Sequence, residues 1–176
     1  MQGASAKRLK VLVSLAALLC GSQAIAQDGA YKTVGGWSIY RNETHCSAYM
    51  MFENREAVGF TYDAPGRSTR IVFSDANATS MKDGASPTLD VLLRMPDETV
   101  DHSWERTVFM VTVDDDGRRT LTSRWLGPPA LETFRKATLV GFYDGERQIG
   151  VFNLRGTAAA LQEVEQCSKA LRSAAQ

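Results

Sequence analysis

The sequence predicts a mainly β fold: an antiparallel β-sandwich or barrel with two short helices, the second of them C-terminal. Three observations predict this class. Apolar and polar residues alternate with period 2 along most of the chain, which is typical of half-buried strands. Tight-turn pairs such as Asp116-Gly117 and Asp144-Gly145 separate the alternating stretches. Helical spacing of apolar residues is confined to two stretches in the last third of the chain.

The predicted strands follow one another with recognisable turns between them. Asp63-Ala64-Pro65-Gly66 is a strong turn, because proline restricts φ and glycine tolerates positive φ. The clearest hairpin joins 107–113 to 120–126 through Asp116-Gly117, and a last hairpin turns at Asp144-Gly145. In chain order, the predicted strands lie within residues 37–39, 46–52, 58–62, 71–73, 89–95, 107–113, 120–126, 139–143 and 148–154.

Two short helices interrupt and end this pattern. Pro128-Pro129 suits a helix start, and helical spacing runs on to about Ala137. The C-terminal helix begins near Thr157, and its stripe of core-facing residues follows helical periodicity. That stripe consists of Leu161, Val164, Ser168 and Leu171, with Cys167 beside it. Cys167 is therefore expected on the side of the helix that faces the core.

The first 26 residues have the features of a secretory signal peptide. A basic segment with Lys7, Arg8 and Lys10 precedes an apolar run, and Ala24-Ile25-Ala26 supplies the small residues that a signal peptidase requires. We therefore predict a signal peptide at 1–26 and a single exported β-rich domain at 27–176. The alternatives are a membrane anchor and a lipoprotein. The apolar run is shorter than the roughly 20 residues needed to span a bilayer, so no membrane span is expected after cleavage. Leu19 disfavours lipidation of the cysteine that follows it.

Removal of this segment changes the charge of the chain. The whole sequence has 20 basic and 20 acidic residues, and the segment carries three basic and no acidic ones. The predicted 150-residue exported protein thus has 17 basic and 20 acidic residues. A mildly acidic chain argues against a nucleic-acid partner. The expected partner is an unknown protein or envelope component.

The exported part of the chain contains two cysteines, Cys46 and Cys167. An even pair in an exported protein predicts one disulfide, and the alternative is two buried free thiols. The disulfide would attach the C-terminal helix to an early strand. Together with the signal peptide, it predicts a periplasmic or secreted protein.

The sequence offers little catalytic or metal-binding chemistry. Its two histidines are His45 and His102, too few for a typical zinc site. Asp101-His102-Ser103 contains the residue types of a hydrolytic triad, but triad members come from separate segments. We expect His102 in a polar loop after Pro96. No catalytic residue, metal site or cofactor is predicted.

The three tryptophans, Trp37, Trp104 and Trp125, are the candidate binding residues. Large aromatic side chains fill the interiors of β-sandwiches, so burial in the core is the default expectation. A tryptophan on an exposed face would instead mark a site for a ligand or partner.

Two segments at the ends of the predicted domain carry a family resemblance. Val34-Gly35-Gly36-Trp37, followed by Ile39 and Cys46, opens the domain, and 149–167 closes it with an apolar strand and an Ala-rich helix. Together they resemble the invasion-associated locus B family, in which a Gly-Asp-Trp segment opens the domain. In that family a strand ending in Phe/Leu-x-Leu-x-Gly leads into an Ala-rich C-terminal helix. The resemblance implies a periplasmic, β-rich, non-enzymatic protein.

Three functions remain open. The first is an exported envelope protein that acts by binding and not by catalysis. The second is a small secreted inhibitor or ligand-binding β-barrel of the lysozyme-inhibitor type, which one disulfide and a compact β domain would fit. The third is a hydrolase that uses Asp101, His102 and Ser103, and it requires a buried cleft at His102.

Overall fold

The computed structural model describes residues 30–174 of the 176-residue chain. The predicted signal peptide at 1–26 and its cleavage site lie outside the described residues.

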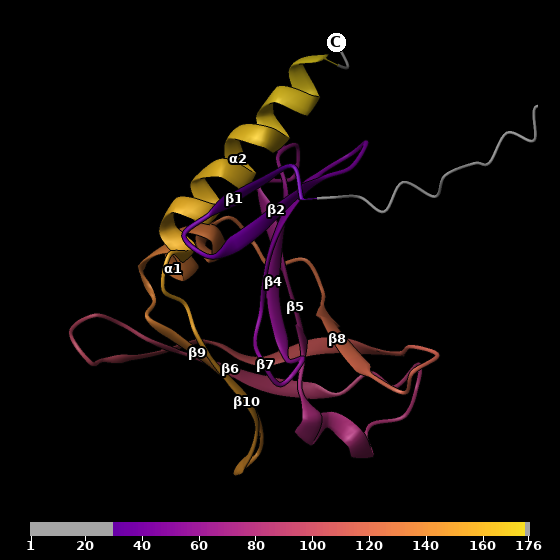
Figure 1. Cartoon of the computed structure of the whole chain (residues 1–176). Coiled ribbons are helices and arrows are strands. Elements are labelled where there is room, and N and C mark those ends of the chain that lie inside the picture. The colour runs from indigo at the N-terminus through magenta and orange to yellow at the C-terminus, as the bar shows by residue number, and fades with distance from the viewer. Residues whose placement is uncertain (1–29, 175–176) are drawn as a thin grey trace, which may run out of the picture.

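Ten strands form one antiparallel sheet in the described part of the chain (Figure 1). Their order across the sheet is β1-β2-β3-β4-β5-β8-β7-β6-β9-β10, so β1 and β10 stand at its two ends and the sheet is not closed. The predicted mainly β, antiparallel fold is confirmed. Of the two predicted arrangements, sandwich and barrel, the described strands do not form a closed barrel. The strands are β1 (Lys32–Val34), β2 (Trp37–Arg41), β3 (Cys46–Met51), β4 (Ala57–Asp63), β5 (Ser68–Ser74), β6 (Thr88–Arg94), β7 (Val100–Val113), β8 (Arg119–Ser123), β9 (Leu139–Asp144) and β10 (Arg147–Asn153).

The long strand β7 bends the sheet. Its first part pairs with β6 and its last part, from Phe109 onward, pairs with β8. The pairing with β6 shifts register twice, which adds residues to β7 and increases its twist. Arg106 lies in one of these bulges with a φ of 57°, and its amide donates a hydrogen bond to Asp90 Oδ1 at 2.8 Å. As a result, β4 and β5 cross β6 and β7 steeply in Figure 1.

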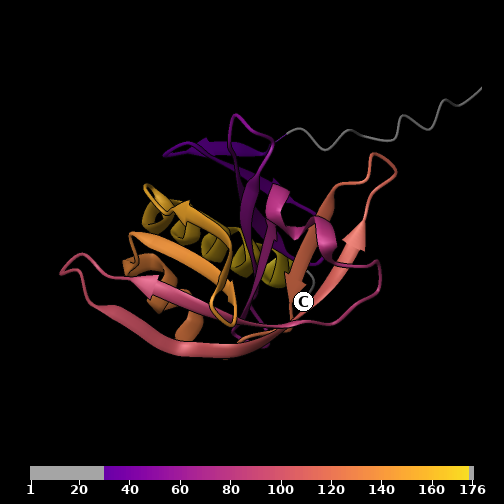
Figure 2. The same cartoon turned by 90° about the horizontal axis from the view of Figure 1, so that it is seen from below.

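The core lies between the two parts of this bent sheet. Phe73 of β5 stacks on Phe142 of β9 with ring centroids 3.8 Å apart, and Phe109 and Phe152 pack around this pair. Seen from below, the curved β6–β7 pair runs along one side of the molecule, and the indigo strands β1 and β2 lie on the opposite side (Figure 2). The alternation of apolar residues therefore directs the side chains of both parts into one shared interior.

Two α-helices cover part of this interior. They are α1 (Pro129–Lys136) and α2 (Thr157–Ala174), and the expectation of two helices, the second C-terminal, is confirmed. Helix α2 packs on β2, β3 and β4 through its buried stripe, which contains Ala160, Leu161, Val164 and Ser168. The ring centroids of Phe134 in α1 and Phe60 in β4 are 5.1 Å apart.

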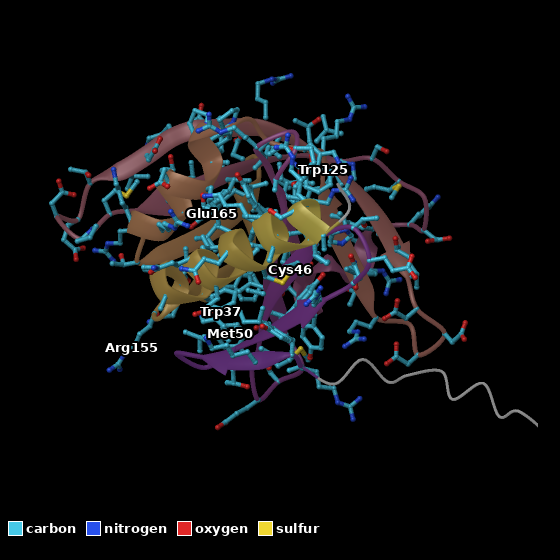
Figure 3. All side chains as sticks on the ribbon, turned by 90° about the horizontal axis from the view of Figure 1, so that it is seen from above. Trp37, Cys46, Met50, Trp125, Arg155 and Glu165 are labelled. Atoms are coloured by element: carbon cyan, nitrogen blue, oxygen red, sulfur yellow. A yellow bond between two sulfur atoms is a disulfide. The ribbon has the colours of Figure 1, made fainter. Side chains whose placement is uncertain are left out.

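The predicted disulfide between Cys46 and Cys167 is present and joins β3 to α2, with Cα atoms 6.0 Å apart (Figure 3). The neighbouring Ser168 hydroxyl is buried. It accepts a hydrogen bond from the Cys46 amide at 3.2 Å and donates one to the Tyr62 carbonyl at 3.1 Å. A bridge of this kind is consistent with an oxidising compartment.

The structure corrects three details of the sequence analysis. Strand β1 and a short 3₁₀ helix at Ala76–Ser80 were not predicted. The polar loop expected around His102 is wrong, because Asp101-His102-Ser103 lies within β7. The physical reason is the pair of bulges, which interrupt the period-2 alternation that identifies a strand.

Candidate functional site

The three predicted binding residues lie in different environments. Trp37 is fully buried, and Trp104 is partly buried with its ring stacked on Phe134 at 6.0 Å. Trp125 is 42% exposed, and the Arg70 guanidinium carbon lies 4.2 Å from its ring centroid. Figure 3 shows Trp37 and Trp125 well apart. The tryptophans therefore do not form one aromatic patch, and Trp125 is the most exposed of the three.

Trp37 has a structural role that links distant parts of the chain. Its indole Nε1 donates a hydrogen bond to the Arg155 carbonyl at 3.0 Å. Next to this bond, Gly35 and Gly156 are in backbone contact, since a Cβ atom on Gly35 would lie 3.1 Å from the Gly156 Cα. Both glycines have positive φ, 58° and 81°. The two segments that carry the family resemblance thus meet in the fold.

His102 does not lie in a buried cleft. Its side chain is 57% exposed on β7, and Nδ1 lies 2.6 Å from Glu105 Oε1, another exposed group. The carboxylate that His102 contacts is therefore a neighbour on the same strand. The arrangement is that of a hydrogen-bonded pair on the surface and lacks the cleft on which the hydrolase interpretation depends.

The turn around His45 favours one tautomer of its neutral ring. Asn42 Oδ1 accepts hydrogen bonds from the amides of Thr44 and His45, at 3.0 and 2.8 Å. This orients Asn42 Nδ2 toward His45 Nε2 at 2.7 Å, so Nε2 must accept, and the ring proton on Nδ1 faces the Thr44 hydroxyl at 2.9 Å. Burial, and then the Arg70 guanidinium, holds the pKa of His45 below its ordinary value of 6.5, with Asp63 opposing.

Among residues 30–174, no group of three His, Cys, Asp or Glu side chains could hold a metal ion. In the acidic turn after β7, Asp114 pairs with Arg118 at 3.1 Å, and Asp116 Oδ1 accepts a hydrogen bond from the Arg118 amide. These carboxylates stabilise a hairpin turn.

The structure contains a groove that the sequence analysis did not predict. Its apolar end lies on the outer face of β6, β9 and β10 and has a volume of about 300 Å³. Leu92 is typical of its lining: it lies between the buried Val91 and Leu93 and points to the opposite face of the sheet. We call this surface and its basic continuation the amphipathic groove. The apolar end is lined by Leu92, Val100, Leu139, Gly141, Tyr143 and Val151, together with the ion pair of Arg94 and Glu98.

Gly141 shapes the floor of the apolar end. A Cβ atom at this position would lie 2.6 Å from Cε2 of the Tyr143 ring. The absence of a side chain therefore allows the ring of Tyr143 to lie over the backbone of β9. Val100 and Val151 remain 47% and 41% exposed beside it. These side chains form an exposed apolar surface beside the ion pair of Arg94 and Glu98.

The basic end continues from the apolar end. It has a volume of about 540 Å³ and shares Arg94, Glu98 and Leu139 with the apolar end. Its far wall is formed by the end of α1 and by the turn before α2. The cations of that wall are Arg135, Lys136 and Arg155. In Figure 3, the Arg155 side chain extends outward from this turn.

The charges at the basic end are unequally compensated. Arg135 contacts Glu132 at 2.7 Å and Glu165 at 2.6 Å, and Arg135 is the main cause that holds the pKa of Glu165 below its usual range. By contrast, the side chains of Lys136 and Arg155 have no ion pair with another described residue. Two positive charges are therefore available to a ligand at this end.

The turn from β6 to β7 forms a wall where the two ends meet. The Met95 amide donates to the Thr99 carbonyl at 2.8 Å, and the Asp97 carboxylate accepts hydrogen bonds from Thr99. These bonds hold the pKa of Asp97 below its usual range, the Thr99 hydroxyl contributing most. The turn also places Glu98 in an ion pair with Arg94. An ordered turn thus contributes Arg94 and Glu98 to the lining of both ends of the groove.

A sequence signal for the groove does exist. In a strand that faces water on one side, apolar and polar residues alternate. Three segments instead contain consecutive apolar residues, namely 91–93, 139–140 and 151–152. Such runs indicate a second apolar face. The cations were not recognisable, because Arg94, Lys136 and Arg155 are far apart in the sequence and isolated from one another.

Comparison with known proteins found no matching family model, no matching curated protein and no matching solved structure. Within 30–174, none of the helices combines the length and the apolar character needed to cross a bilayer.

Proposed function

We propose that this chain is an exported, periplasmic envelope protein that acts by binding, with the amphipathic groove as its binding site. The observation that carries the proposal is the groove itself, which joins an exposed apolar floor to a wall with two uncompensated cations. Pockets that hold ligands are concave and largely apolar, with a few polar groups that fix orientation. The proposed mode of action is therefore reversible binding and not chemical conversion.

The proposal includes membership of the invasion-associated locus B-like proteins. It is supported by the contact between the two resembling segments, through Gly35 and Gly156 and through the Trp37–Arg155 hydrogen bond. Because these residues hold the two segments in contact, the two ends of the domain form one structural unit. The disulfide between Cys46 and Cys167 supports export to an oxidising compartment.

Export is tested by expressing the full chain with its own N-terminus in a Gram-negative host. The expected result is a periplasmic protein whose first residue is Gln27, measured by cell fractionation and intact mass. A chain that stays cytoplasmic with its N-terminus uncleaved would overturn the periplasmic part of the proposal.

Binding is tested by thermal unfolding of the exported protein in the presence of lysozyme, peptidoglycan fragments, and anionic and cationic amphiphiles. At least one of these classes of ligand should raise the midpoint of thermal unfolding of the wild type and leave the midpoint of Val151→Asp unchanged. Met110→Asp, at a similarly exposed apolar position on β7, is the matched control. If the protein instead turned over substrates in a broad hydrolase screen and His102→Ala removed this activity, the hydrolase interpretation would replace ours.

A second candidate function rests on Trp125. Tryptophan and arginine are enriched among the residues that dominate protein–protein binding, and Trp125 and Arg70 form an exposed pair. This favours the inhibitor alternative, in which the chain binds an enzyme such as lysozyme. Trp125→Ala should then weaken binding to immobilised lysozyme, while Val151→Asp should not. Recovery of no lysozyme by the wild type would end this alternative.

A further inference from the structure

We infer that the occupant of the amphipathic groove is a single-chain amphiphile with an anionic headgroup, taken up as a monomer. Its hydrocarbon chain would lie over Gly141 and Tyr143, and its headgroup would contact Lys136 and Arg155. This inference rests on the proposed binding function and specifies the chemistry of the ligand.

The backbone of the groove floor favours a hydrocarbon chain over a peptide. Strand β9 pairs with β6 on one side and with β10 on the other, so its backbone N–H and C=O groups are already hydrogen-bonded within the sheet. A peptide lying on this floor would find no backbone partner in β9, so its amides would gain no hydrogen bond beyond those that water already provides. A hydrocarbon chain has no such groups.

The side chains of the floor lead to the same conclusion. Leu92, Leu139 and Val151 offer apolar contacts without hydrogen-bond donors. The volume of about 300 Å³ is at the lower end of the range for small-molecule pockets, which suits one chain better than a two-chain lipid.

Three of the four cations of the groove line the basic end alone, and Arg94 lines both ends. Among the residues that line the basic end, Arg94, Arg135, Lys136 and Arg155 are positive and Glu98 is negative. Glu98 pairs with Arg94, and Arg135 is compensated by Glu132 and Glu165. Lys136 and Arg155 therefore carry the charge that is left for a ligand. A carboxylate or phosphate monoester at the end of an apolar chain complements this arrangement.

The test measures binding of monomeric dodecanoate to the exported protein by calorimetry, below the concentration at which the amphiphile forms micelles. Dodecanoate should bind, whereas dodecyltrimethylammonium, with the same chain and opposite charge, and butyrate, with the same headgroup and a short chain, should not. The affinity should fall as salt is raised, because the headgroup contact is electrostatic.

Two variants separate the headgroup contact from the chain contact. The double variant K136E/R155E should weaken dodecanoate binding by about tenfold or more, since two attractions become repulsions. Val151→Asp should weaken it by a similar factor. The matched controls are K82E/R41E, which reverses two exposed cations elsewhere, and Met110→Asp. Both controls should bind dodecanoate as the wild type does and should unfold cooperatively.

The possible outcomes distinguish this inference from the proposed function. If dodecanoate does not bind but another molecule does, and Val151→Asp abolishes that binding, the inference is wrong and the binding function stands. An acidic peptide that bound in this way would be one such result. If the wild type sedimented with dioleoyl phosphatidylglycerol vesicles and Val151→Asp did not, the ligand of the groove would be a membrane surface and not a monomeric amphiphile. If nothing binds in a manner that depends on the groove, both proposals fail.

Discussion

The indole nitrogen of Trp37 donates a hydrogen bond to the carbonyl of Arg155 at 3.0 Å, although 118 residues separate them. Trp37 is the first residue of β2, and Arg155 lies in the turn that leads from β10 to α2. The same turn supplies a cation to the basic end of the amphipathic groove. A buried core residue therefore helps to position the backbone from which a surface charge projects.

Replacing Trp37 with Phe keeps an aromatic ring in the core and removes the donor. The Arg155 carbonyl then loses its partner, and the free energy of unfolding should fall by about 1–3 kcal/mol, with a further loss from the smaller ring. Urea unfolding measures this change. Trp125→Phe, at the exposed tryptophan, should stay within about 0.5 kcal/mol of the wild type. Equal stability of the two variants would show that the Trp37 bond contributes nothing.

Gly156→Ala should destabilise the fold through a direct backbone clash. Its φ is 81°, and a Cβ atom there would collide with the Gly35 carbonyl oxygen. Gly145 provides a matched control, because it also has positive φ, 61°, but has open space around it. Gly156→Ala should therefore cost about 1–3 kcal/mol more than Gly145→Ala, the usual range for overpacking. Losses of the same size in both variants would mean that the close contact is unimportant.

Removal of the disulfide should destabilise the protein strongly. The Cys46–Cys167 bridge closes a loop with a sequence separation of 121, and loss of such a bridge typically costs about 2–5 kcal/mol. The double variant Cys46→Ala/Cys167→Ala should show this loss in urea unfolding. Mass spectrometry of the non-reduced wild type should find one peptide that links the two cysteines. Free thiols at both positions would contradict the bridge.

The turn around His45 predicts a dependence of stability on pH. The folded protein holds the pKa of His45 below 6.5, so folding favours the neutral ring. Its stabilising contribution is present above the unfolded pKa, near 6.5, and is lost as pH falls through the lower folded pKa. Urea unfolding at pH 7.5 and pH 5 should show a smaller loss for His45→Gln than for the wild type.

Arg70→Gln separates the two causes of the His45 shift. Burial of the ring is the larger cause and Arg70 the second. Arg70→Gln should therefore reduce the loss of stability at low pH and should not remove it. If His45→Gln lost as much stability as the wild type over this pH interval, another group would be responsible.

Much of the fold was predictable from local patterns. Period-2 alternation identified the strands, and Asp116-Gly117 and Asp144-Gly145 identified two hairpins that the structure contains. Where β7 forms bulges, the alternation fails, and for this reason His102 was expected in a loop. The candidate site was less predictable. Trp125 was named among its possible residues, but Tyr143, Val151, Lys136 and Arg155 were not.

The sequence by itself determined most of the strand and helix pattern, and it favoured a bridge between the two cysteines of the predicted exported domain over two free thiols. These properties depend on neighbouring residues or on a count. Only the tertiary structure decided which tryptophan is exposed and that Arg94, Lys136 and Arg155 border one groove. Such relationships depend on the bend at β7 and on the Gly35–Gly156 contact, which bring distant segments together. No local pattern contains the angle at which the two parts of the sheet cross.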